Sequence, residues 1–514
     1  MKITLINPNI VSQKVDLSGS GIPYMPIGLA YLASYLRSQN HDIRVIDAFG
    51  EAPEQVRSSG PYYIQGLTLE QVVDRVPVDT TVIGFYAHLT VTHNTLLEII
   101  SHVKNRFPDC RTVVLENINK VNAYSLRQVY LDFFKLGVDY VVLGYLEKRT
   151  QRILEAIQTG APVFDIDGVI VKDNGGKFIP PHDFTKETDL DALPFPAWDL
   201  FPVVNYWRLG YAHGPLTTGR YLPLLSSRGC AYNCGFCIMP EVSDRKWKAR
   251  SAENVVEEIE YFQKKFNVNE FHFEDVNPTL NKKRIKDFCR LLIERNIRII
   301  WKLAQGTKLE SLDSEAIDLM AEAGCNYVSM SPESGSRRML KLMDKPVDLE
   351  HAVEMFSLMN KKGIYTQACF VLGYPGETEH DLQMTAELVR RLAKIGVDEV
   401  ALFIITPMPG SQIFKQYLEK FQALNQLTFT PKWREDYIKI SRFRKRLYMQ
   451  YVIIKMLYHP LRMLGYGWAL LTRRFRTKVE MTVFRKLKVA WLAKKIKCST
   501  NKFNILSYNI SVLK

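Results

Sequence analysis

An alternation of β-rich runs and helical patterns constrains this 514-residue chain more than any other feature. From residue 222 onward, runs rich in β-branched and aromatic residues alternate with helical patterns six times. The six predicted strands are 222–226, 270–273, 299–303, 326–331, 365–372 and 399–406. Six β/α units in a row predict an open, partial barrel of parallel strands. Functional residues of such barrels follow the carboxyl ends of the strands.

The first 160 residues show the same alternation in a second unit. Predicted strands are 2–6, 43–47, 81–86, 112–115 and 140–143, and helical patterns include 27–38 and 95–106. This order predicts a doubly wound parallel sheet with helices on both faces. Ligands of such sheets bind beyond the carboxyl ends of the strands.

The whole chain is too long for a single core, so we expect an α/β protein of several parts. A Rossmann-like domain spans 1–160 and a partial (β/α)6 barrel spans 216–425. Between them, residues 161–215 show little periodicity and contain Pro180-Pro181 and the run 193–198, which predicts a linker. Residues 426–514 form a basic, amphipathic helical tail.

Charge and cysteine usage are both uneven along the chain. Residues 431–514 hold 21 Lys and Arg against 3 Asp and Glu, a net charge of +18, whereas residues 1–430 carry −4. Three of the eight cysteines lie within eight residues, which favours a metal site in a reducing compartment over a disulfide framework. The opening residues indicate a short strand, not a secretory signal, so we expect a cytoplasmic protein.

The clustered cysteines follow the first barrel strand. Cys230, Cys234 and Cys237 form a C-x3-C-x2-C motif on a loop. Cubane iron–sulfur clusters normally take four thiolates, so three leave one iron open to another ligand. The alternative is a structural zinc site. Zinc requires a fourth ligand nearby, and the nearest downstream candidates, His272 and Cys289, are remote.

This motif, with the aromatic Phe236 before its last cysteine, resembles the signature of the radical S-adenosylmethionine superfamily. The resemblance covers about residues 215–420. It implies a [4Fe–4S] cluster whose open iron binds S-adenosylmethionine, and reductive cleavage to the 5′-deoxyadenosyl radical. It also implies that Glu274, after the second strand, contacts the methionine moiety. Glu333, after the fourth strand, matches a position that binds ribose hydroxyls.

Residues 1–160 resemble the cobalamin-binding domain that often precedes such a barrel. The matching pieces include Gly28-Leu29, Asp47 and Gly84, and His88 and Thr90 follow a strand where they would face a corrin. The segment departs from the family at Glu116-Asn117, where paired glycines are usual, and in the turn 144–147. There is no D-x-H-x-x-G motif, so no histidine is expected on cobalt. The alternative is a docking domain that binds nothing.

The basic tail interleaves Lys and Arg with Trp, Phe and Leu. This pattern is typical of a helix lying in a membrane interface, and it has no uninterrupted apolar span of about 20 residues. We therefore expect contact with the inner face of the membrane. The alternative is a helical cap on the barrel with a solvated basic face. No motif indicates nucleic acid binding, which is not expected.

The resemblance implies cobalamin-dependent methylation of an unactivated carbon. Alternatives are another radical reaction, such as cyclisation, ring contraction or carbon–carbon coupling, or a non-catalytic cluster-binding protein. A methylthiolating enzyme is disfavoured because the N-terminal domain lacks a second cysteine triad. Expected partners are a small-molecule or lipid substrate and an electron donor such as flavodoxin or ferredoxin.

Overall fold

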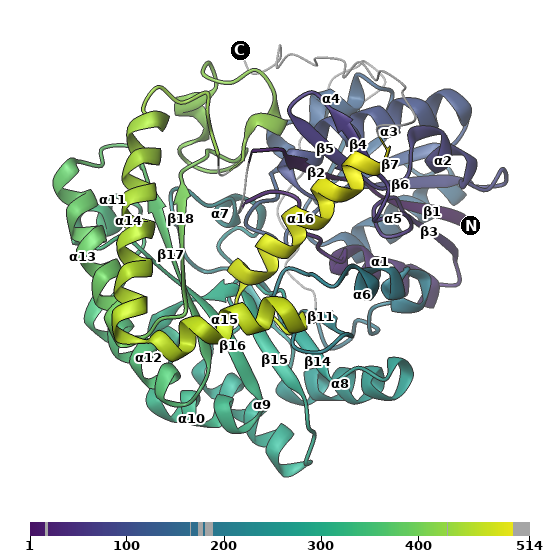
Figure 1. Cartoon of the computed structure of the whole chain (residues 1–514). Helices are drawn as coiled ribbons and strands as arrows, with labels where there is room; N and C mark the ends of the chain where they lie inside the picture. The colour runs from purple at the N-terminus through teal and green to yellow at the C-terminus, as the bar shows by residue number, and fades with distance from the viewer. Residues whose placement is uncertain (16–18, 165, 173–177, 180–188, 429, 497–514) are drawn as a thin grey trace.

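The computed structural model describes residues 1–514 except 16–18, 165, 173–177, 180–188, 429 and 497–514. Pro180-Pro181 therefore lies outside the described residues. The chain forms two α/β units side by side; three C-terminal helices lie on the second unit, and the last of them extends across to the first (Figure 1). The predicted α/β fold is confirmed.

The N-terminal sheet has seven strands in the order β10-β9-β8-β7-β6-β1-β3. β1 (Lys2–Asn7), β3 (Asp42–Asp47), β6 (Val82–Ala87), β7 (Arg111–Glu116) and β8 (Tyr140–Val142) run parallel. Strand order reverses between β1 and β6, which makes this the switch point where ligands of such sheets bind. All five predicted strands are present.

Two strands of this sheet come from the predicted linker. β9 (Val169–Lys172) pairs antiparallel with β8, and β10 (Phe178–Ile179) pairs with β9. An antiparallel edge needs no crossover helix, so it lacks the β/α alternation by which the other strands were recognised. α6 (Val203–Leu209) follows in the same segment.

Helices cover the N-terminal sheet, and a small sheet lies beside it. α1 (Ile27–Ser38) contacts α5 (Leu146–Thr159), and α2 (Leu69–Asp74) contacts α3 (His93–Arg106). The two pairs belong to separate hydrophobic cores. The remaining elements are α4 (Tyr130–Phe134) and a three-stranded sheet of β2 (Ile10–Gln13), β5 (Tyr62–Gln65) and β4 (Val56–Ser59).

The second unit is a six-stranded parallel sheet whose strands follow chain order. They are β11 (Leu222–Leu224), β14 (Glu270–Phe273), β15 (Ile300–Thr307), β16 (Cys325–Glu333), β17 (Tyr365–Leu372) and β18 (Glu399–Ile404). β11 and β18 are the two edges, so the sheet is open. β15 continues four residues past its predicted end, which carries Thr307 to the functional edge.

The intervening helices begin and end at local capping signals. They are α8 (Ala252–Phe266), α9 (Lys282–Glu294), α10 (Ser314–Glu322), α11 (Arg337–Leu342), α12 (Leu349–Lys361) and α13 (Glu379–Ile395). Thr378 and Asp381 form a capping box at the start of α13. Gly396 ends that helix with a φ of 101°, a conformation that glycine adopts without strain.

Buried polar contacts join the two units. Arg228 donates two hydrogen bonds to the carboxylate of Glu147, at 2.9 and 2.7 Å, and Gln305 donates to the carbonyl of Asn119 at 2.6 Å. Tyr31 of α1 donates to Glu258 of α8 at 2.9 Å. These bonds fix the carboxyl ends of both sheets toward one another.

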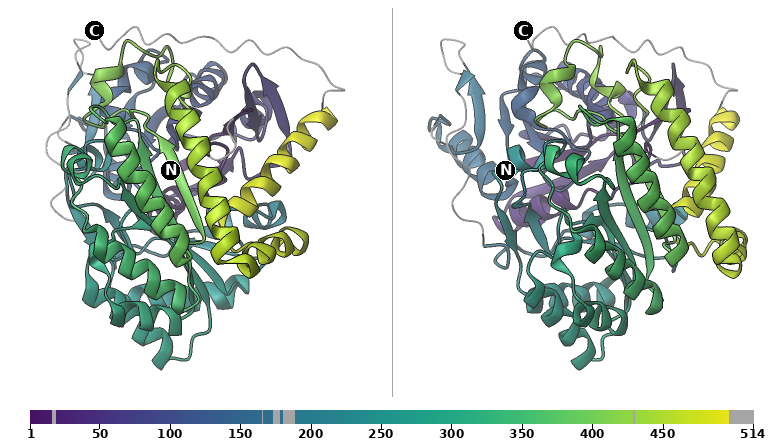
Figure 2. Two further views of the ribbon diagram at one scale, coloured as in Figure 1. Left: turned by 60° about the vertical axis from the view of Figure 1, so that its left-hand side comes forward. Right: turned by 90° about the vertical axis from the view of Figure 1, so that its left-hand side faces the viewer.

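The C-terminal region forms α14 (Tyr437–Tyr458), α15 (Pro460–Thr472) and α16 (Lys478–Ile496). α14 packs on α13, and Tyr451 donates to the carbonyl of Val397 at 2.8 Å. α16 runs from the second unit to β4 of the N-terminal domain (Figures 1 and 2). No helix of the described residues is long and apolar enough to cross a membrane.

Candidate functional site

The cysteine motif lies on a loop after β12 (Ser227–Gly229), which pairs with β13 (Trp247–Ala249). Gly229 has a φ of 79°, and a Cβ there would stand 2.1 Å from the carbonyl oxygen of Lys246. Only glycine fits this turn. The loop is held by a bond from the Gly235 N–H to the Met343 carbonyl, at 2.9 Å.

Cys230, Cys234 and Cys237 all line one cavity of about 530 Å³, together with Phe236. Burial raises the pKa of all three thiols, although the nearby Lys345 favours their thiolate forms. Within the described residues, no group of three or more His, Cys, Asp or Glu is placed to hold one metal ion. A cubane does not require that arrangement, because each thiolate binds a different iron.

The ends of the parallel strands meet the cysteines at this cavity. Asn277 follows β14, Thr307 ends β15, Glu333 ends β16 and Thr406 follows β18, and all four line the cavity. The carboxyl ends of the strands therefore border the cavity, which is where barrels of this kind carry their functional residues.

Glu333 adopts a φ of 63°, which is rare for a residue with a side chain. Its carboxylate forms a buried ion pair with Lys345. Burial raises the pKa of Glu333, and the Lys345 ammonium opposes that rise. Such a strained, paired carboxylate is typical of a ligand-binding position.

Glu274 is buried but does not line the cavity. It accepts hydrogen bonds from Lys120 of the N-terminal domain and from Nδ1 of His213, the latter at 2.9 Å. Burial lowers the pKa of His213 to about 3. Although burial acts to raise it, the pKa of Glu274 lies well below its usual value, because His213 and Lys120 favour the carboxylate. In this structure Glu274 joins the two units; methionine contact stays a prediction.

The six residues predicted to contact a corrin are all buried, and none lines the cavity. They are Gly28, Leu29, Asp47, Gly84, His88 and Thr90.

Several of these six hold the strand-end loops together. Asp47 accepts from Asn7, from the Gly50 N–H and from Tyr206, and burial raises its pKa to about 6. The Thr90 hydroxyl donates to backbone carbonyls of the loop after β7.

The two residues that replace the family's paired glycines also hold loops. The Glu116 carboxylate accepts from the Leu126 and Gly144 N–H groups at 2.8 and 2.7 Å. The Asn117 amide donates to the His88 carbonyl at 2.8 Å. At these two positions, the side chains of Glu116 and Asn117 therefore occupy space that the family's glycines leave free.

Sequence reasoning missed the N-terminal residues that do line the cavity: Gly19, Ile22, Tyr24, Val121 and Asn122. Val121 and Asn122 follow β7 of the parallel sheet, so the strand-end rule was the available signal for them. The other three follow β2 of the small antiparallel sheet, to which that rule does not apply. Sequence reasoning also missed Lys308, Lys345, Lys478 and Arg485, for which no local motif exists.

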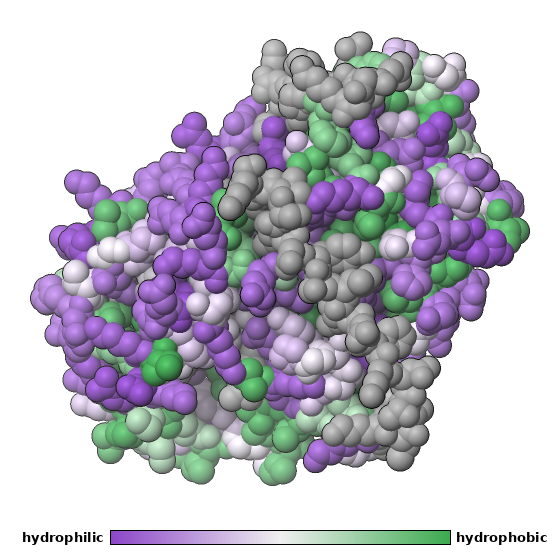
Figure 3. Space-filling view, turned by 90° about the horizontal axis from the view of Figure 1, so that it is seen from above, coloured by the Kyte–Doolittle hydropathy of each residue, from purple (hydrophilic) through white to green (hydrophobic). Residues whose placement is uncertain are grey.

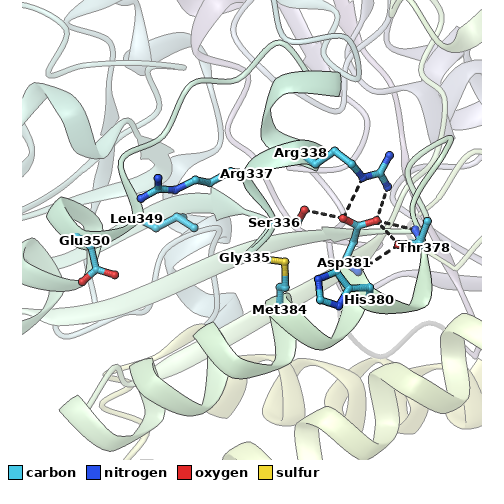
Figure 4. A pocket seen from close by; sticks show the side chains of 10 residues that line it. All are labelled: Gly335, Ser336, Arg337, Arg338, Leu349, Glu350, Thr378, His380, Asp381 and Met384. Atoms are coloured by element: carbon cyan, nitrogen blue, oxygen red, sulfur yellow. Dashed lines mark hydrogen bonds and ion pairs between the residues drawn. The ribbon is translucent and has the colours of Figure 1, made fainter.

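A second cavity, of about 320 Å³, lies away from the cysteines, between the start of α11 and α13 (Figure 4). Its polar centre is Asp381, which accepts hydrogen bonds from Ser336, Thr378 and Arg338. Asp381 therefore fixes two helix starts, and we assign no ligand to this cavity.

A model of the radical SAM superfamily matches residues 224–389, the span that contains the cysteine loop and Glu333. An uncharacterised methyltransferase of Pyrococcus horikoshii is 26% identical over 85% of this chain and 86% of its own length.

Two solved structures share the fold. TsrM of Kitasatospora setae, a radical S-adenosylmethionine methyltransferase with bound cobalamin and a [4Fe–4S] cluster, superposes with a TM-score of 0.61 at 18% identity. The match covers 82% of this chain and 76% of TsrM. OxsB, a cobalamin-dependent radical enzyme, superposes with a TM-score of 0.63 at 15% identity over 98% of this chain and 81% of OxsB. Residues 224–389 of the chain thus match the radical SAM superfamily, and the chain shares the fold of these two enzymes.

Proposed function

We propose that this protein is a radical S-adenosylmethionine enzyme that methylates an unactivated carbon with the help of cobalamin. The observation that carries the proposal is one cavity lined by Cys230, Cys234, Cys237 and Glu333 and walled by both α/β units. The similarity to a methyltransferase of Pyrococcus horikoshii and the fold shared with TsrM and OxsB support the same proposal.

The residues present fit a cluster and S-adenosylmethionine. Three thiols on one glycine-bounded loop face a common space, and they would hold three irons and leave the fourth open. Bound there, the cluster supplies the electron for reductive cleavage of S-adenosylmethionine. Glu333 would accept hydrogen bonds from ribose hydroxyls; burial raises its pKa, and the paired Lys345 ammonium favours its ionised form. The apolar walls exclude water from a reactive radical.

Cobalamin fits the arrangement less directly. Ligands of such sheets bind beyond the carboxyl ends of the strands, and on the side of the N-terminal domain the cavity is lined by Ile22, Tyr24, Val121 and Asn122. These residues would contact a corrin, which would supply the methyl group. The nearby His88 has its pKa lowered to about 3 by burial, and its ring packs against Tyr24 and Tyr86. The ring of Tyr24 lines the cavity and packs against the ring of His213. Because a corrin is a large ligand, we expect its binding to move the Tyr24 ring away from His213.

The partners follow from the same chemistry. A flavodoxin or ferredoxin would supply electrons, and the substrate is a small molecule. We also propose that the basic C-terminal region contacts the inner face of the membrane, because it concentrates a charge of +18 in 84 residues, 431–514.

The test is anaerobic reconstitution with iron, sulfide and hydroxocobalamin, followed by mass spectrometry. Methyl transfer predicts one corrin per chain and both 5′-deoxyadenosine and S-adenosylhomocysteine from S-adenosylmethionine. Formation of 5′-deoxyadenosine without retained corrin would overturn the methyltransferase proposal and leave the radical chemistry standing.

A further inference from the structure

Two rows of apolar side chains face outward on the C-terminal helices. On α15, Leu461, Leu464, Trp468 and Leu471 are between 64 and 82% exposed. Their spacings of three and four residues put them on one face of the helix. A surface helix normally turns such a face toward the core, so this row marks an interaction site.

The second row runs along α16. Val479, Val483, Leu487 and Trp491 follow at intervals of four residues and are between 46 and 69% exposed. The opposite side of α16 is already packed, since Val489, Leu492 and Ala493 lie against Val56. α15 and α16 contact each other and lie on the same side of the molecule (Figures 1 and 2). We call the eight residues of the two rows the docking face.

The cavity that contains the cysteines opens on this face. Val479 and Val483 line the cavity and are also about half exposed, so they form part of its rim. From this rim the α16 row continues outward to Leu487 and Trp491. A row of apolar side chains therefore connects the surface of the protein with the cavity that contains the cysteines.

Apolar side chains continue into the interior of the cavity. Val400, Leu402 and Ile405 of the last strand and its extension line one wall. Lys478 and Arg485 of α16 also line the cavity, and Arg485 is buried at 3% exposure, so these cationic groups lie inside the cavity. Apolar walls with buried cations suit a ligand with a long apolar part and an anionic or polar head.

The surroundings of the docking face are basic. Arg473 and Arg474 are exposed at the end of α15, and Lys494 is exposed near the end of α16. Figure 3 shows the molecule from above, and hydrophilic side chains cover much of the surface coloured there. Hydrophobic side chains gather along the lower edge of that view, which corresponds to the front of the molecule in Figure 1. Basic residues flanking exposed Trp and Leu complement an anionic lipid surface.

We propose that the docking face binds an anionic phospholipid bilayer and that the substrate is an amphipathic lipid, which enters the cavity from the bilayer past Val479 and Val483. The lipid assignment rests on the proposed function, because it names the substrate of that site. The bilayer contact stands without it. Apolar rows that reach a cavity rim favour a bilayer over a nucleic acid, which would contact basic groups alone.

Vesicle flotation of the full-length holoenzyme tests the bilayer contact. We expect binding to vesicles of phosphatidylglycerol and phosphatidylethanolamine, weakening with salt, and little binding to phosphatidylcholine alone. The double variant Leu464→Glu/Trp468→Glu should partition at least about tenfold less, a change of about 1.4 kcal/mol. Val78→Glu, at an equally exposed apolar residue of the N-terminal domain, should float as wild type.

Equal flotation of wild type and the double variant, with unchanged iron content and circular dichroism, would overturn the bilayer contact. So would a stable dimer in light scattering that the double variant dissociates, because a second copy would then cover the docking face.

Formation of 5′-deoxyadenosine tests the lipid substrate. The reconstituted holoenzyme is given either the chloroform-soluble or the water-soluble extract of the same cells. We expect the lipid extract to stimulate turnover at least about fivefold more. Leu402→Trp, which narrows the cavity at a buried residue outside the docking face, should lose this stimulation yet still float.

The two proposals fail in different ways. Stimulation by the aqueous extract alone would overturn the lipid substrate and leave the proposed radical enzyme standing. A protein that holds its iron but forms no 5′-deoxyadenosine under any condition would overturn the proposed function itself, and the substrate assignment with it.

Discussion

The carboxylate of Glu399 accepts a hydrogen bond from the backbone N–H of Lys478 at 3.2 Å. Its second oxygen accepts from the N–H of Val479 at 3.0 Å, and Tyr327 donates to the same side chain. The first residue of β18 thus caps the N-terminus of α16. This cap attaches α16 to β18, the edge strand of the open sheet. There α16 lines the cavity that contains the cysteines.

Replacing Glu399 with Ala should loosen α16. The change leaves two helix-terminal N–H groups and the Tyr327 hydroxyl without their acceptor, so we expect a loss of about 1–3 kcal/mol. Hydrogen exchange should accelerate in the amides of residues 478–481 and much less in β14. Glu399→Gln keeps one acceptor oxygen, so its exchange rates in these amides should lie between those of the wild type and the Ala variant. Unchanged protection in the Ala variant would show that the cap does not hold the helix.

Replacing Cys230, Cys234 or Cys237 with Ala should remove most of the iron and all 5′-deoxyadenosine formation, because each thiolate is expected to hold one iron. Iron and sulfide assays and the visible absorption of the cluster measure this. Cys110→Ala is the matched control, since this free cysteine lies in the N-terminal domain outside the cavity. A triple Ala variant with a full iron load would refute the ligand assignment.

Replacing Glu333 with Gln should weaken S-adenosylmethionine binding about tenfold or more. A hydrogen bond to a charged group contributes about 1.5–3 kcal/mol, and the neutral amide loses much of it. Equilibrium dialysis measures the Kd, and the iron content should be unchanged because no thiol is touched. An unaltered Kd would place the ribose elsewhere in the cavity.

Replacing Arg228 with Met should destabilise the contact between the two units. Glu147 would remain as a buried charge without its partner, at a cost of about 3–5 kcal/mol. The double variant Arg228→Met/Glu147→Leu should recover most of that loss, since it removes both charges. Urea unfolding followed by circular dichroism measures both. If the double variant were as unstable as Arg228→Met, the loss of stability would come from lost packing and not from the unpaired charge of Glu147.

Glu116 should make stability depend on pH. Burial raises its pKa to about 7, whereas the carboxyl titrates near 4.5 in the unfolded chain. Between these values the folded state binds more protons than the unfolded state, so the free energy of unfolding falls as the pH rises. A difference of about 2.5 pKa units corresponds to roughly 3 kcal/mol. Glu116→Gln should flatten this slope in urea titrations between about pH 4.5 and 7; parallel slopes would contradict the assignment.

The sequence by itself determined the strands and the cysteine loop, because both are local. Alternation of β-rich and helical runs marked all six strands of the second sheet, and C-x3-C-x2-C is complete within eight residues. Glu333, which the family resemblance singled out after the fourth strand, lines the same cavity as the cysteines; its contact with ribose stays a prediction. The antiparallel β9 and β10 were missed because they lack the crossover helix that defines the pattern.

Only the tertiary structure decided which residues meet across the fold. Lys120 and Glu274 are far apart in sequence, and their contact places Glu274 at the interface between the two units. The six residues matched to a corrin site do not line the cavity, whereas Ile22, Tyr24, Val121 and Asn122 of the same domain do. Lys478 and Arg485 reach the cavity because Glu399 caps a helix from a distant strand. Long-range burial and pairing are set by packing of whole elements, and no local pattern records them.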